Sequence, residues 1–428
     1  MAKHRRTCAV RSSSAATTSC QRATRGRLSC GIQDFSRDVV VIGGCGRVGL
    51  PLGLAFADRG LRVTLFDINP VAVGRVEAGN LPFDEPGARE VMARVAGRTL
   101  DATTDAACVA QAEHVVIVVG TPVDEHLNPE PAAVPKAVAA VAEHLRDGQL
   151  LVLRSTLYPG VTAMVERLVA DLGKDIDVTF CPERIAEGKA MTELFELPQL
   201  VAARTDRAME RSAKLFHTLT AQVVPLAPEE AELAKLFTNT WRYIRFAIAN
   251  QLFMIANDFG LDFERIRGAM AHDYPRAADL PGAGFAAGPC LLKDTMQLAA
   301  FNNNNFTLGH AAMMVNEGLP LYLVHRLEQR FDLPAMTVGI LGMGFKADSD
   351  DPRDSLSYKL KRILAFKAAG VLSTDPHVRT DPDLVPLDDV LDRADVLVIG
   401  APHRAYAGLK PRQPVVDIWD LYGNGVLV

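Results

Sequence analysis

The stretch Val39-Val-Val-Ile-Gly-Gly-Cys-Gly-Arg-Val-Gly49 decides the fold of the first half of this chain. A run of β-branched apolar residues, typical of a buried strand, leads into a glycine-rich turn and then into a segment with helical periodicity. A second strand-like run occupies residues 62–66 and leads to Asp67, eighteen residues beyond Gly49. This order of strand, turn, helix and strand is typical of the opening unit of a dinucleotide-binding domain.

Each part of this turn has a physical role in binding a dinucleotide. The three glycines of the GxGxxG pattern allow, in order, a tight turn, a close approach of the backbone to a pyrophosphate, and close packing of the helix. The helix N-terminus supplies N–H donors for phosphates, and the acid after the second strand accepts hydrogen bonds from ribose hydroxyls and repels a 2′-phosphate, which favours NAD over NADP. A glycine turn without a ligand is the alternative. The predicted cofactor contacts here are Gly44, Gly46, Arg47, Val48, Gly49 and Asp67.

Further strand-like runs, at residues 115–119 and 150–155, alternate with helical stretches such as residues 134–145. This alternation predicts an α/β fold with a doubly wound parallel sheet. Loops at the carboxyl ends of such strands line the ligand crevice. We therefore expect Thr121 and Thr156 to lie beside the cofactor, although ordinary turns would also account for these residues.

Composition limits the classes of partner. The chain has 428 residues, with 46 basic and 51 acidic side chains and a net charge of −5, which predicts no strong attraction to nucleic acid or to anionic lipid. No apolar stretch reaches the roughly 18 residues of a membrane-spanning helix, so we expect a soluble protein whose partners are small molecules. The seven cysteines lack the spacing of a zinc site and the density of a disulfide scaffold, which favours free thiols, no bound metal and a cytoplasmic location.

Residues 1–37 differ in kind from the rest of the chain. They hold eight Lys or Arg residues and a single acid, Asp34, in a sequence rich in Ser and Thr that has no apolar face. Such a segment buries too little surface to offset the entropy of ordering, so we predict a disordered tail. A transit peptide and a vestigial extension are equally consistent with its composition.

A long helix is predicted from Pro228 to Gly260. Proline and acidic residues open it, and apolar residues then keep helical spacing over about 30 residues. A helix of that length commonly bridges domains or subunits. Lys235 and Asn239 stand four apart on one face, with Arg242 one turn further, and taken alone this trio is typical of a solvated stripe.

A loop rich in glycine and proline runs from Leu280 to Asp294 and contains Cys290. A structural thiol would normally stand within periodic apolar sequence, whereas this one is followed by Lys293 and Asp294 at the third and fourth positions. That polar setting favours the thiolate, so we interpret Cys290 as a reactive nucleophile. Cys45, Cys108 and Cys181 are interpreted as small buried hydrophobes.

A second strand and glycine turn occur at Thr337-Val-Gly-Ile-Leu-Gly-Met-Gly-Phe-Lys346, and residues 394–402 have the pattern of a later strand in the same sheet. Ala347 stands where a third glycine of a dinucleotide turn is expected. The pattern therefore indicates a nucleotide site that is not a second dinucleotide site.

With these motifs in order, the chain resembles the nucleotide-sugar 6-dehydrogenases, the group that includes UDP-glucose, UDP-N-acetylmannosamine and GDP-mannose dehydrogenases. The resemblance extends from about Val39 to the end of the chain. It rests on the first glycine turn and on Gly79-Asn-Leu-Pro82, Glu85-Pro-Gly87, Gly120-Thr-Pro122, Ser155-Thr-Leu-Tyr-Pro-Gly160, Cys181-Pro-Glu-Arg-Ile185, Glu187-Gly188, Glu232, Lys235 to Asn239, Gly288-Pro-Cys290, Lys293-Asp294, Gly344-Phe-Lys346 and Asp350-Asp-Pro-Arg353.

The resemblance implies an architecture, a cofactor and partners. Two Rossmann-like domains are joined by a helical middle domain organised by the long helix, NAD is the cofactor, and the substrate is a nucleotide sugar. A homodimer or higher homo-oligomer built through the long helix is expected. The implied boundaries are a tail at 1–37, an NAD-binding domain at 38–225, a central domain at 226–330 and a nucleotide-sugar-binding domain at 331–428.

The resemblance also implies a four-electron oxidation of a C6 alcohol to a uronic acid. An aldehyde does not readily release hydride, because no adjacent oxyanion expels it; attack by Cys290 gives a thiohemiacetal that does, and water then hydrolyses the thioester. Lys235 and Asn239 would stabilise negative charge on the sugar O6. Matching positions assign Asp294, Glu183 and Thr156 to water and proton handling, Lys293 and Arg353 to the cofactor, and Glu187, Arg276, Phe285 and Lys346 to the substrate.

Two other interpretations stay open from the sequence. A two-electron hydroxyacid-type dehydrogenase has the same opening domain and a long helix but needs no thiol, and a nucleotide-sensing relative would keep the fold without turnover. The segment Phe285-Ala-Ala-Gly-Pro289 also departs from the Gly-rich approach to the cysteine in much of the family. The substrate is therefore open between a UDP-hexose and a UDP-N-acetylhexosamine.

Overall fold

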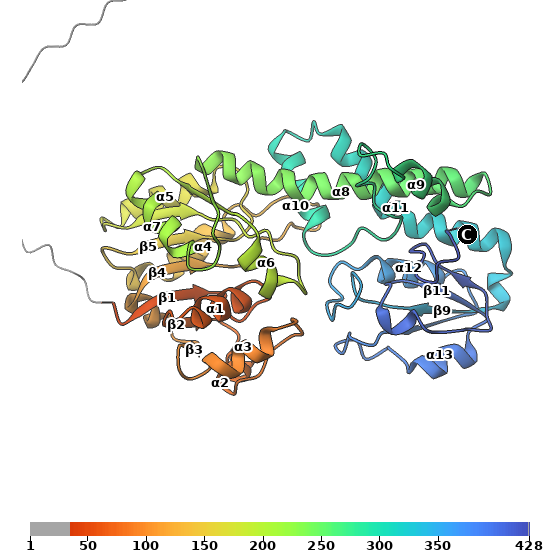
Figure 1. Cartoon of the computed structure of the whole chain (residues 1–428), viewed down its shortest axis with the longest axis horizontal. Coiled ribbons are helices and arrows are strands. Elements are labelled where there is room, and N and C mark those ends of the chain that lie inside the picture. The colour runs from red at the N-terminus through yellow and green to blue at the C-terminus, as the bar shows by residue number, and fades with distance from the viewer. Residues whose placement is uncertain (1–34, 427) are drawn as a thin grey trace, which may run out of the picture. The chain divides into compact units, whose positions relative to one another are not determined.

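The computed structural model describes residues 35–426 and Val428, and the first of its two sheets has eight strands (Figure 1). These strands are β1 (Arg37–Ile42), β2 (Val63–Phe66), β3 (Leu100–Thr103), β4 (Ala112–Ile117), β5 (Leu150–Leu153), β6 (Asp177–Phe180), β7 (Gln199–Ala203) and β8 (Val223–Leu226). Their order is β3-β2-β1-β4-β5-β6-β7-β8, and all neighbours are parallel except β6 and β7. The predicted doubly wound parallel sheet is confirmed, with one antiparallel pair that the sequence pattern does not reveal.

Helices and short 3-10 turns cover both faces of this sheet. They are α1 (Gly49–Asp58), α2 (Pro70–Glu77), α3 (Ala88–Val95), η1 (Ala106–Gln111), α4 (Ala133–Ala140), η2 (Ala142–His144), α5 (Val161–Asp171), α6 (Ala190–Glu196) and α7 (Asp206–Phe216). Val39 and Val41 share a core with α1, α2, α3 and α7, whereas Val40 and Ile42 share a core with α4 and α5. Because alternate side chains of β1 are buried on opposite faces, the strand needs the continuous apolar run seen in the sequence.

The start of the ordered fold differs from the predicted boundary. Residues 1–34, on which most of the disordered-tail prediction falls, lie outside the described residues. Arg37, which that prediction also includes, begins β1 and forms an ion pair with Asp101. The Arg146 guanidinium carbon lies 5.7 Å from the centre of the Phe35 ring. The first domain therefore uses residues that composition alone assigns to the tail.

Helix α8 (Pro228–Asp258) has 31 residues and packs against α10 (Leu291–Phe301) and α11 (Thr307–Arg330). At its start the Glu230 carboxylate accepts a hydrogen bond from the backbone N–H of Ala227 at 2.8 Å. A shorter helix, α9 (Phe263–Ala271), follows it. Within the described residues, neither α8 nor any other helix is long and apolar enough to cross a membrane.

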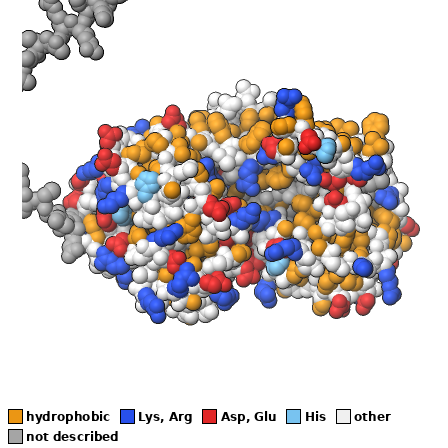
Figure 2. All heavy atoms as spheres, in the orientation of Figure 1, with side chains coloured by type: hydrophobic (Ala, Val, Ile, Leu, Met, Phe, Trp, Pro, Cys, Tyr) orange, Lys and Arg blue, Asp and Glu red, His pale blue; other side chains and the backbone are white. Residues whose placement is uncertain are grey.

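One face of α8 is apolar and exposed. Phe237, Trp241, Ile248 and Ile255 are each between 46% and 56% exposed. Figure 2 shows hydrophobic side chains gathered along the edge that α8 forms in Figure 1. Helical spacing predicts that these residues share a stripe, but it does not distinguish a stripe that faces the core from one that faces solvent.

The second sheet has four parallel strands in the order β10-β9-β11-β12. Its elements are η3 (Leu333–Ala335), β9 (Thr337–Leu341), α12 (Leu356–Leu364), β10 (Gly370–Thr374), α13 (Leu387–Arg393), β11 (Val396–Ile399), η4 (Arg404–Tyr406) and β12 (Val415–Val416). Val338 and Ile340 pack with α11 and α12, and Leu341 packs with α13 on the other face. The second Rossmann-like sheet predicted from the strand and glycine turn is thus present.

Candidate active site

The turn between β1 and α1 leaves one side open for a ligand. Gly43 rather than Gly44 adopts the left-handed conformation, with φ of 76°, so the tight turn lies one residue before its predicted position. A Cβ on Gly44 would lie 2.7 Å from the Leu65 Cβ, and one on Gly49 would lie 2.3 Å from a backbone oxygen, so packing requires both glycines. A Cβ on Gly46 would meet only the Gly43 carbonyl oxygen, at 3.4 Å. The backbone at Gly46 therefore has room beside it for a pyrophosphate, and its contact with the cofactor stays a prediction.

Asp67 directly follows β2 and faces this turn. Its Oδ2 accepts a hydrogen bond from the Cys45 backbone N–H at 3.0 Å, and its Oδ1 accepts one from the Asn69 N–H at 3.0 Å. Each carboxylate oxygen keeps a further lone pair for a ribose hydroxyl. The open backbone at Gly46 and the carboxylate of Asp67 together fit a dinucleotide. Burial raises the pKa of the Cys45 thiol to about 12, which agrees with its interpretation as an inert hydrophobe.

A pocket beside β5 brings together two more of the predicted cofactor residues. Thr121 and Thr156 line it, with Gln297 from α10. The Lys293 ammonium lies 3.5 Å from the Thr121 hydroxyl, and the Gln297 amide donates to the Thr121 carbonyl oxygen at 3.4 Å. The Oε1 atom of Gln297 is buried and has no hydrogen-bond partner among the described residues. Gln297 was not predicted, although its position one turn after Lys293 on the same helix was an available signal.

Cys290 occupies the N-cap position of α10 and is exposed. Although one side of the residue is open, the surrounding protein removes water from the sulfur, and this desolvation, with the charge of Asp294, raises the pKa of the thiol. The positive charges of Lys235, Lys293 and Arg353 oppose that shift. The predicted preference for the thiolate is therefore wrong, because it took account of neighbouring charges but not of the loss of water.

Asp294 is fully buried on α10, one turn after Cys290. Its Oδ2 accepts a hydrogen bond from the Asn239 amide at 2.5 Å, and its Oδ1 pairs with the Lys293 ammonium at 2.5 Å. A buried carboxylate needs such partners, because it has lost its hydration. The structure thus joins three predicted residues from two helices into one cluster beside the thiol.

Lys235 and Asn239 lie on the buried face of α8, at 8% and 4% exposure, whereas Arg242 is exposed. The interpretation as a solvated stripe is wrong for the first two residues, because α10 packs over that face. Among residues 35–426, the Lys235 ammonium has no hydrogen-bond or ion-pair partner, and its charge acts on Cys290. Its donors are available to a ligand.

Glu183 is held by groups that sequence analysis did not connect with it. Its Oε1 accepts hydrogen bonds from the backbone N–H groups of Arg184 and Ile185, at 2.7 and 2.9 Å, and its other oxygen pairs with Arg154. Arg154 follows β5, is almost fully buried, and lies with its guanidinium carbon 5.0 Å from the centre of the Phe216 ring. The role of Glu183 in hydrolysis stays a prediction, and Arg154 is the residue that fixes its carboxylate.

The loop that carries Cys290 is fixed to α8 by Asn250. The Asn250 amide accepts from the Gly284 N–H at 2.9 Å and donates to the Gly284 carbonyl oxygen at 3.0 Å. The next residue, Phe285, is buried, with its ring edge-on to Trp419 at 6.1 Å between centroids. Phe285 was predicted to contact the substrate, but here its ring belongs to the core because it packs on the second sheet's domain.

Arg276 contacts Tyr274. It is exposed, its Nε donates to the Tyr274 hydroxyl at 2.8 Å, and its guanidinium carbon lies 4.7 Å from the centre of the Tyr274 ring. Within the described part of the chain, no hydrogen bond or ion pair joins it to the other predicted substrate contacts. Its substrate-binding role stays a prediction.

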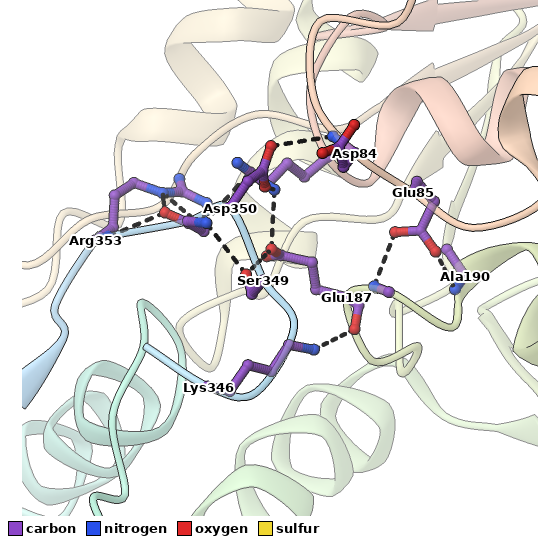
Figure 3. A network of polar contacts seen from close by, with 11 residues as sticks. Asp84, Glu85, Glu187, Ala190, Lys346, Ser349, Asp350 and Arg353 are labelled. Atoms are coloured by element: carbon purple, nitrogen blue, oxygen red, sulfur yellow. Dashed lines mark hydrogen bonds and ion pairs between the residues drawn. The ribbon is translucent and has the colours of Figure 1, made fainter. Parts of the chain in front are cut away.

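The remaining substrate-side residues form a polar network, shown in Figure 3. The Lys346 ammonium donates to the backbone carbonyl of Glu187, and the Ser349 hydroxyl donates to its carboxylate at 2.9 Å. Burial raises the pKa of Glu187, and the positive charge of Arg47 opposes the shift. Arg353 pairs within its own loop, its Nη2 lying 2.6 Å from Asp351. The network therefore joins residues of the first domain to the loop that follows β9.

The second glycine turn is filled by a side chain. Asp375, directly after β10, has a fully buried carboxylate that accepts from the N–H groups of Met343 and Gly344 at 2.6 and 2.9 Å, and from His403 at 2.9 Å. The Nδ1 of His403 accepts from the Asp348 N–H at 2.8 Å, which leaves Nε2 as the donor to Asp375. Both ring nitrogens are therefore occupied, so this cluster of histidine and aspartate is a hydrogen-bond network and does not present His403 to a metal.

Comparison with known proteins identifies the family. The NAD-binding, central and UDP-binding domains of the UDP-glucose/GDP-mannose dehydrogenase family match residues 37–220, 229–318 and 339–424. The chain belongs to the UDP-glucose/GDP-mannose dehydrogenase family. This confirms the family predicted from the motifs, and with it NAD as the cofactor. Members of this family are NAD-dependent dehydrogenases of nucleotide sugars, and the match to the UDP-binding domain supports a nucleotide-sugar substrate.

This member of the UDP-glucose/GDP-mannose dehydrogenase family is similar to proteins whose names give different substrates. It is 30% identical to a UDP-N-acetyl-D-mannosamine dehydrogenase of Yersinia pestis, over 92% of this chain and 100% of that protein. It is also 30% identical to the UDP-glucose 6-dehydrogenase AglM of Haloferax volcanii, over 86% of this chain and 91% of that protein. The structure of a UDP-glucose dehydrogenase from Pyrobaculum islandicum matches with a TM-score of 0.83 and 29% identity, over 93% of this chain and 96% of that one.

Proposed function

We propose that this protein oxidises the C6 primary alcohol of a nucleotide sugar to the carboxylate in two NAD-dependent steps, through a covalent adduct on Cys290. The observation that carries the proposal is the cluster at the start of α10. Cys290, which is exposed, lies there beside the buried carboxylate of Asp294, which has two partners. The charge of Lys235, whose ammonium has no partner among the described residues, acts on the thiol. A two-electron dehydrogenase needs no thiol in such a place.

The first oxidation needs a group that stabilises the alkoxide developing at O6. Lys235 supports this role, because the residue is buried and its side-chain nitrogen has no hydrogen-bond or ion-pair partner in the described chain. The Asn239 side-chain amide donates one hydrogen bond to Asp294 and keeps a second N–H donor. Preorganised donors of this kind stabilise an oxyanion more strongly in a site that excludes water than they would in solution. When bound, NAD⁺ would supply the hydride acceptor for both oxidations, so each acid formed would correspond to two NADH.

The second oxidation needs the sulfur. Cys290 loses its proton and its sulfur attacks the C6 carbonyl carbon, giving a thiohemiacetal whose oxyanion expels the second hydride and leaves a thioester. Water then cleaves the C–S bond, releasing the carboxylic acid and restoring the thiol. Because desolvation raises the pKa of the thiol, a base has to take its proton, and Asp294 is the nearby carboxylate. The position at the N-terminus of α10 stabilises the thiolate once it forms.

The substrate is a UDP-hexose or a UDP-N-acetylhexosamine in this proposal. The UDP-binding domain match supports the uridine nucleotide, and relatives with either kind of sugar in their names have the same identity to this chain. A homodimer or higher homo-oligomer is part of the proposal, and the exposed apolar face of α8 supports it. An apolar surface of this kind is commonly covered by another protein surface.

The test is to incubate the purified protein with NAD⁺ and a panel of nucleotide sugars, and to count NADH per product by absorbance and mass spectrometry. Two NADH per uronic acid would support the proposal. One NADH with an aldehyde or ketone product would favour the two-electron alternative. No NADH with any sugar, while UDP still binds, would favour a nucleotide-sensing protein.

A pair of cysteine variants tests the covalent step. Cys290→Ser should abolish formation of the acid, because serine is a far weaker nucleophile at neutral pH, and should leave a slow single oxidation. Cys108→Ala is the matched control, because burial raises the pKa of that thiol to about 11 and it lies in η1, away from α10. Full acid formation by Cys290→Ser would refute the thioester.

A further inference from the structure

The guanidinium of Arg47 is bound by carboxylates from outside its own turn. Arg47 lies between Gly46 and Gly49, in the turn that accommodates a dinucleotide. Its Nη1 lies 2.9 Å from the Glu187 carboxylate and 2.7 Å from that of Asp350, and its Nε lies 3.5 Å from that of Asp351. Three carboxylates therefore surround one cation.

The network also connects the loop after β9 with backbone segments of the first domain (Figure 3). The second oxygen of Asp350 accepts a hydrogen bond from the backbone N–H of Asp84, at 3.0 Å. The neighbouring Glu85 is buried and accepts from the N–H groups of Gly188 and Ala190, both at 2.8 Å. The loop after β9 is thus tied to the first domain both through Arg47 and through the backbone before Glu85.

These contacts are partly shielded from water. The side chains of Arg47, Glu187 and Asp350 are 21%, 16% and 17% exposed, and that of Asp351 is 1% exposed. The Arg47 guanidinium carbon also lies 5.0 Å from the centre of the Phe83 ring. Ion pairs with little exposure and several hydrogen bonds are coupled more strongly than surface pairs, so the network resists separation of its two sides.

The same loop carries Lys346, which the resemblance assigns to the substrate, and Arg353, which it assigns to the cofactor. Lys346 and Arg353 flank the acidic stretch, and the charge of Arg353 acts on the Cys290 thiol. An anionic pyrophosphate beside the Arg47 side chain would be repelled by the carboxylates already bound to it. The side chain of Arg47 is therefore better placed to hold this loop than to bind the cofactor, for which the backbone of the turn suffices.

We propose that Arg47 is a positioning residue that holds loop 346–353 against the first domain and so couples the cofactor turn to the nucleotide-sugar site. The inference rests on the proposed function, since it takes the loop to contact the substrate. It assigns to Arg47 a role in affinity for the nucleotide sugar, although Arg47 lies in the NAD-binding domain. Coupling of this kind commonly changes affinity by about 5- to 150-fold.

The experiment compares Arg47→Gln, Asp350→Ala and the double variant by calorimetric titration with UDP and, separately, with NAD⁺. Each single variant should bind UDP about tenfold more weakly, and the double variant no more weakly than either, because each change breaks the same connection. Affinity for NAD⁺ should stay within about threefold in Asp350→Ala, because Asp350 lies outside the turn that accommodates the dinucleotide. Arg47→Lys should restore part of the UDP affinity, because it keeps the charge.

Arg59→Gln is the matched control. Arg59 is a cation in the same domain whose guanidinium carbon lies 4.7 Å from the centre of the Phe195 ring. This variant should bind UDP as the unchanged protein does. Loss of NAD⁺ affinity with unchanged UDP affinity in Arg47→Gln, or UDP losses that multiply in the double variant, would overturn the proposal.

Hydrogen exchange followed by mass spectrometry gives a readout that needs neither substrate nor turnover. Without ligands, peptides covering residues 346–353 should exchange faster in Arg47→Gln and in Asp350→Ala than in the unchanged protein. Unchanged exchange in both would overturn the proposal. If the unchanged protein neither bound UDP nor produced NADH, the proposed function would fail, and this measurement would still decide whether Arg47 holds the loop.

Discussion

The chain contains two units in which a strand leads into a glycine turn, one after β1 and one after β9. The two turns differ in the residue at their fourth position. Gly46 is the fourth residue after β1, and Phe345 is the fourth residue after β9. The position of Gly46 is open, whereas the position in the second turn carries the Phe345 ring. This ring packs closely on Gly288, because a Cβ added to Gly288 would lie 2.5 Å from a ring carbon of Phe345. The first turn therefore has room for a ligand at Gly46, whereas an aromatic side chain occupies the corresponding position of the second turn.

The acid after the second strand of each unit shows the same difference. Asp67 accepts two backbone hydrogen bonds and is half-buried. The side chain of Asp375 is fully buried and accepts from Met343, Gly344 and His403, and also from the N–H groups of His377 and Val378. One carboxylate is available to a ribose, and the other serves as an internal ligand of its own turn. A similar local pattern thus supports binding in one domain and stability in the other.

The largest expected effect is that of Asp375→Ala on stability. Removing this carboxylate leaves several donors buried without a partner, so the free energy of unfolding should fall by about 3–5 kcal/mol. Urea denaturation followed by circular dichroism measures it. Asp67→Ala is the control and should lower the free energy of unfolding by less than about 1 kcal/mol. Equal losses in the free energy of unfolding would mean that Asp67 and Asp375 stabilise their domains to the same extent.

A smaller effect is expected for Asp67→Ala on cofactor affinity. Loss of the charged acceptors for ribose hydroxyls should weaken NAD⁺ binding by about 1.5–3 kcal/mol, which is roughly 10- to 100-fold. Loss of the negative charge should also reduce discrimination against NADP⁺. Titration calorimetry with both cofactors checks this. Unchanged NAD⁺ affinity would contradict the assignment of Asp67.

Gly46→Ala tests the open side of the first turn. The new methyl group has room in the protein, but it would stand where the pyrophosphate approaches, so NAD⁺ affinity should fall about tenfold while stability changes little. Gly49→Ala should instead destabilise the domain, because its methyl would lie 2.3 Å from a backbone oxygen. A stability loss in Gly46→Ala equal to that in Gly49→Ala would show that the turn is not open.

The smallest expected effect is the pH dependence of the second domain. Burial opposes ionisation of Asp375, but His403 and the backbone N–H groups prevail and hold the pKa of this carboxyl well below its usual range. A folded-state pKa below the unfolded value of about 3.9 means that Asp375 adds stability above that pH and loses it on acidification. The stability difference from Asp375→Asn should be constant between about pH 5 and 8 and shrink below about pH 4. A difference that grew on acidification would contradict this.

Much of the fold follows from local patterns in the sequence. The apolar run at residues 39–42 predicts a strand buried on both faces, and the spacing from Pro228 to Gly260 predicts α8 within two residues of its observed end. The antiparallel pairing of β6 with β7 does not follow, because pairing direction depends on the path of the chain between strands. The exposure of the apolar stripe on α8 could not be predicted either, because periodicity shows which residues share a face but not whether another element covers that face.

The candidate active site was predictable in identity but less so in arrangement. Cys290, Asp294, Lys235 and Asn239 stand at motif positions, and the structure brings them together. The raised pKa of the thiol could not be predicted, because desolvation depends on packing around the sulfur. Gln297 and Arg154 were missed because neither belongs to a recognised motif.

The sequence by itself determined where strands and turns lie, because backbone conformation and apolar periodicity depend on residues close together in the chain. Only the tertiary structure decided what each charge contacts. Arg47 meets Asp350 across 303 positions of sequence, and Asp375 turns inward because His403 lies beside it. Electrostatic partners are set by distance in space and by exclusion of water, and neither quantity is a property of a local sequence pattern.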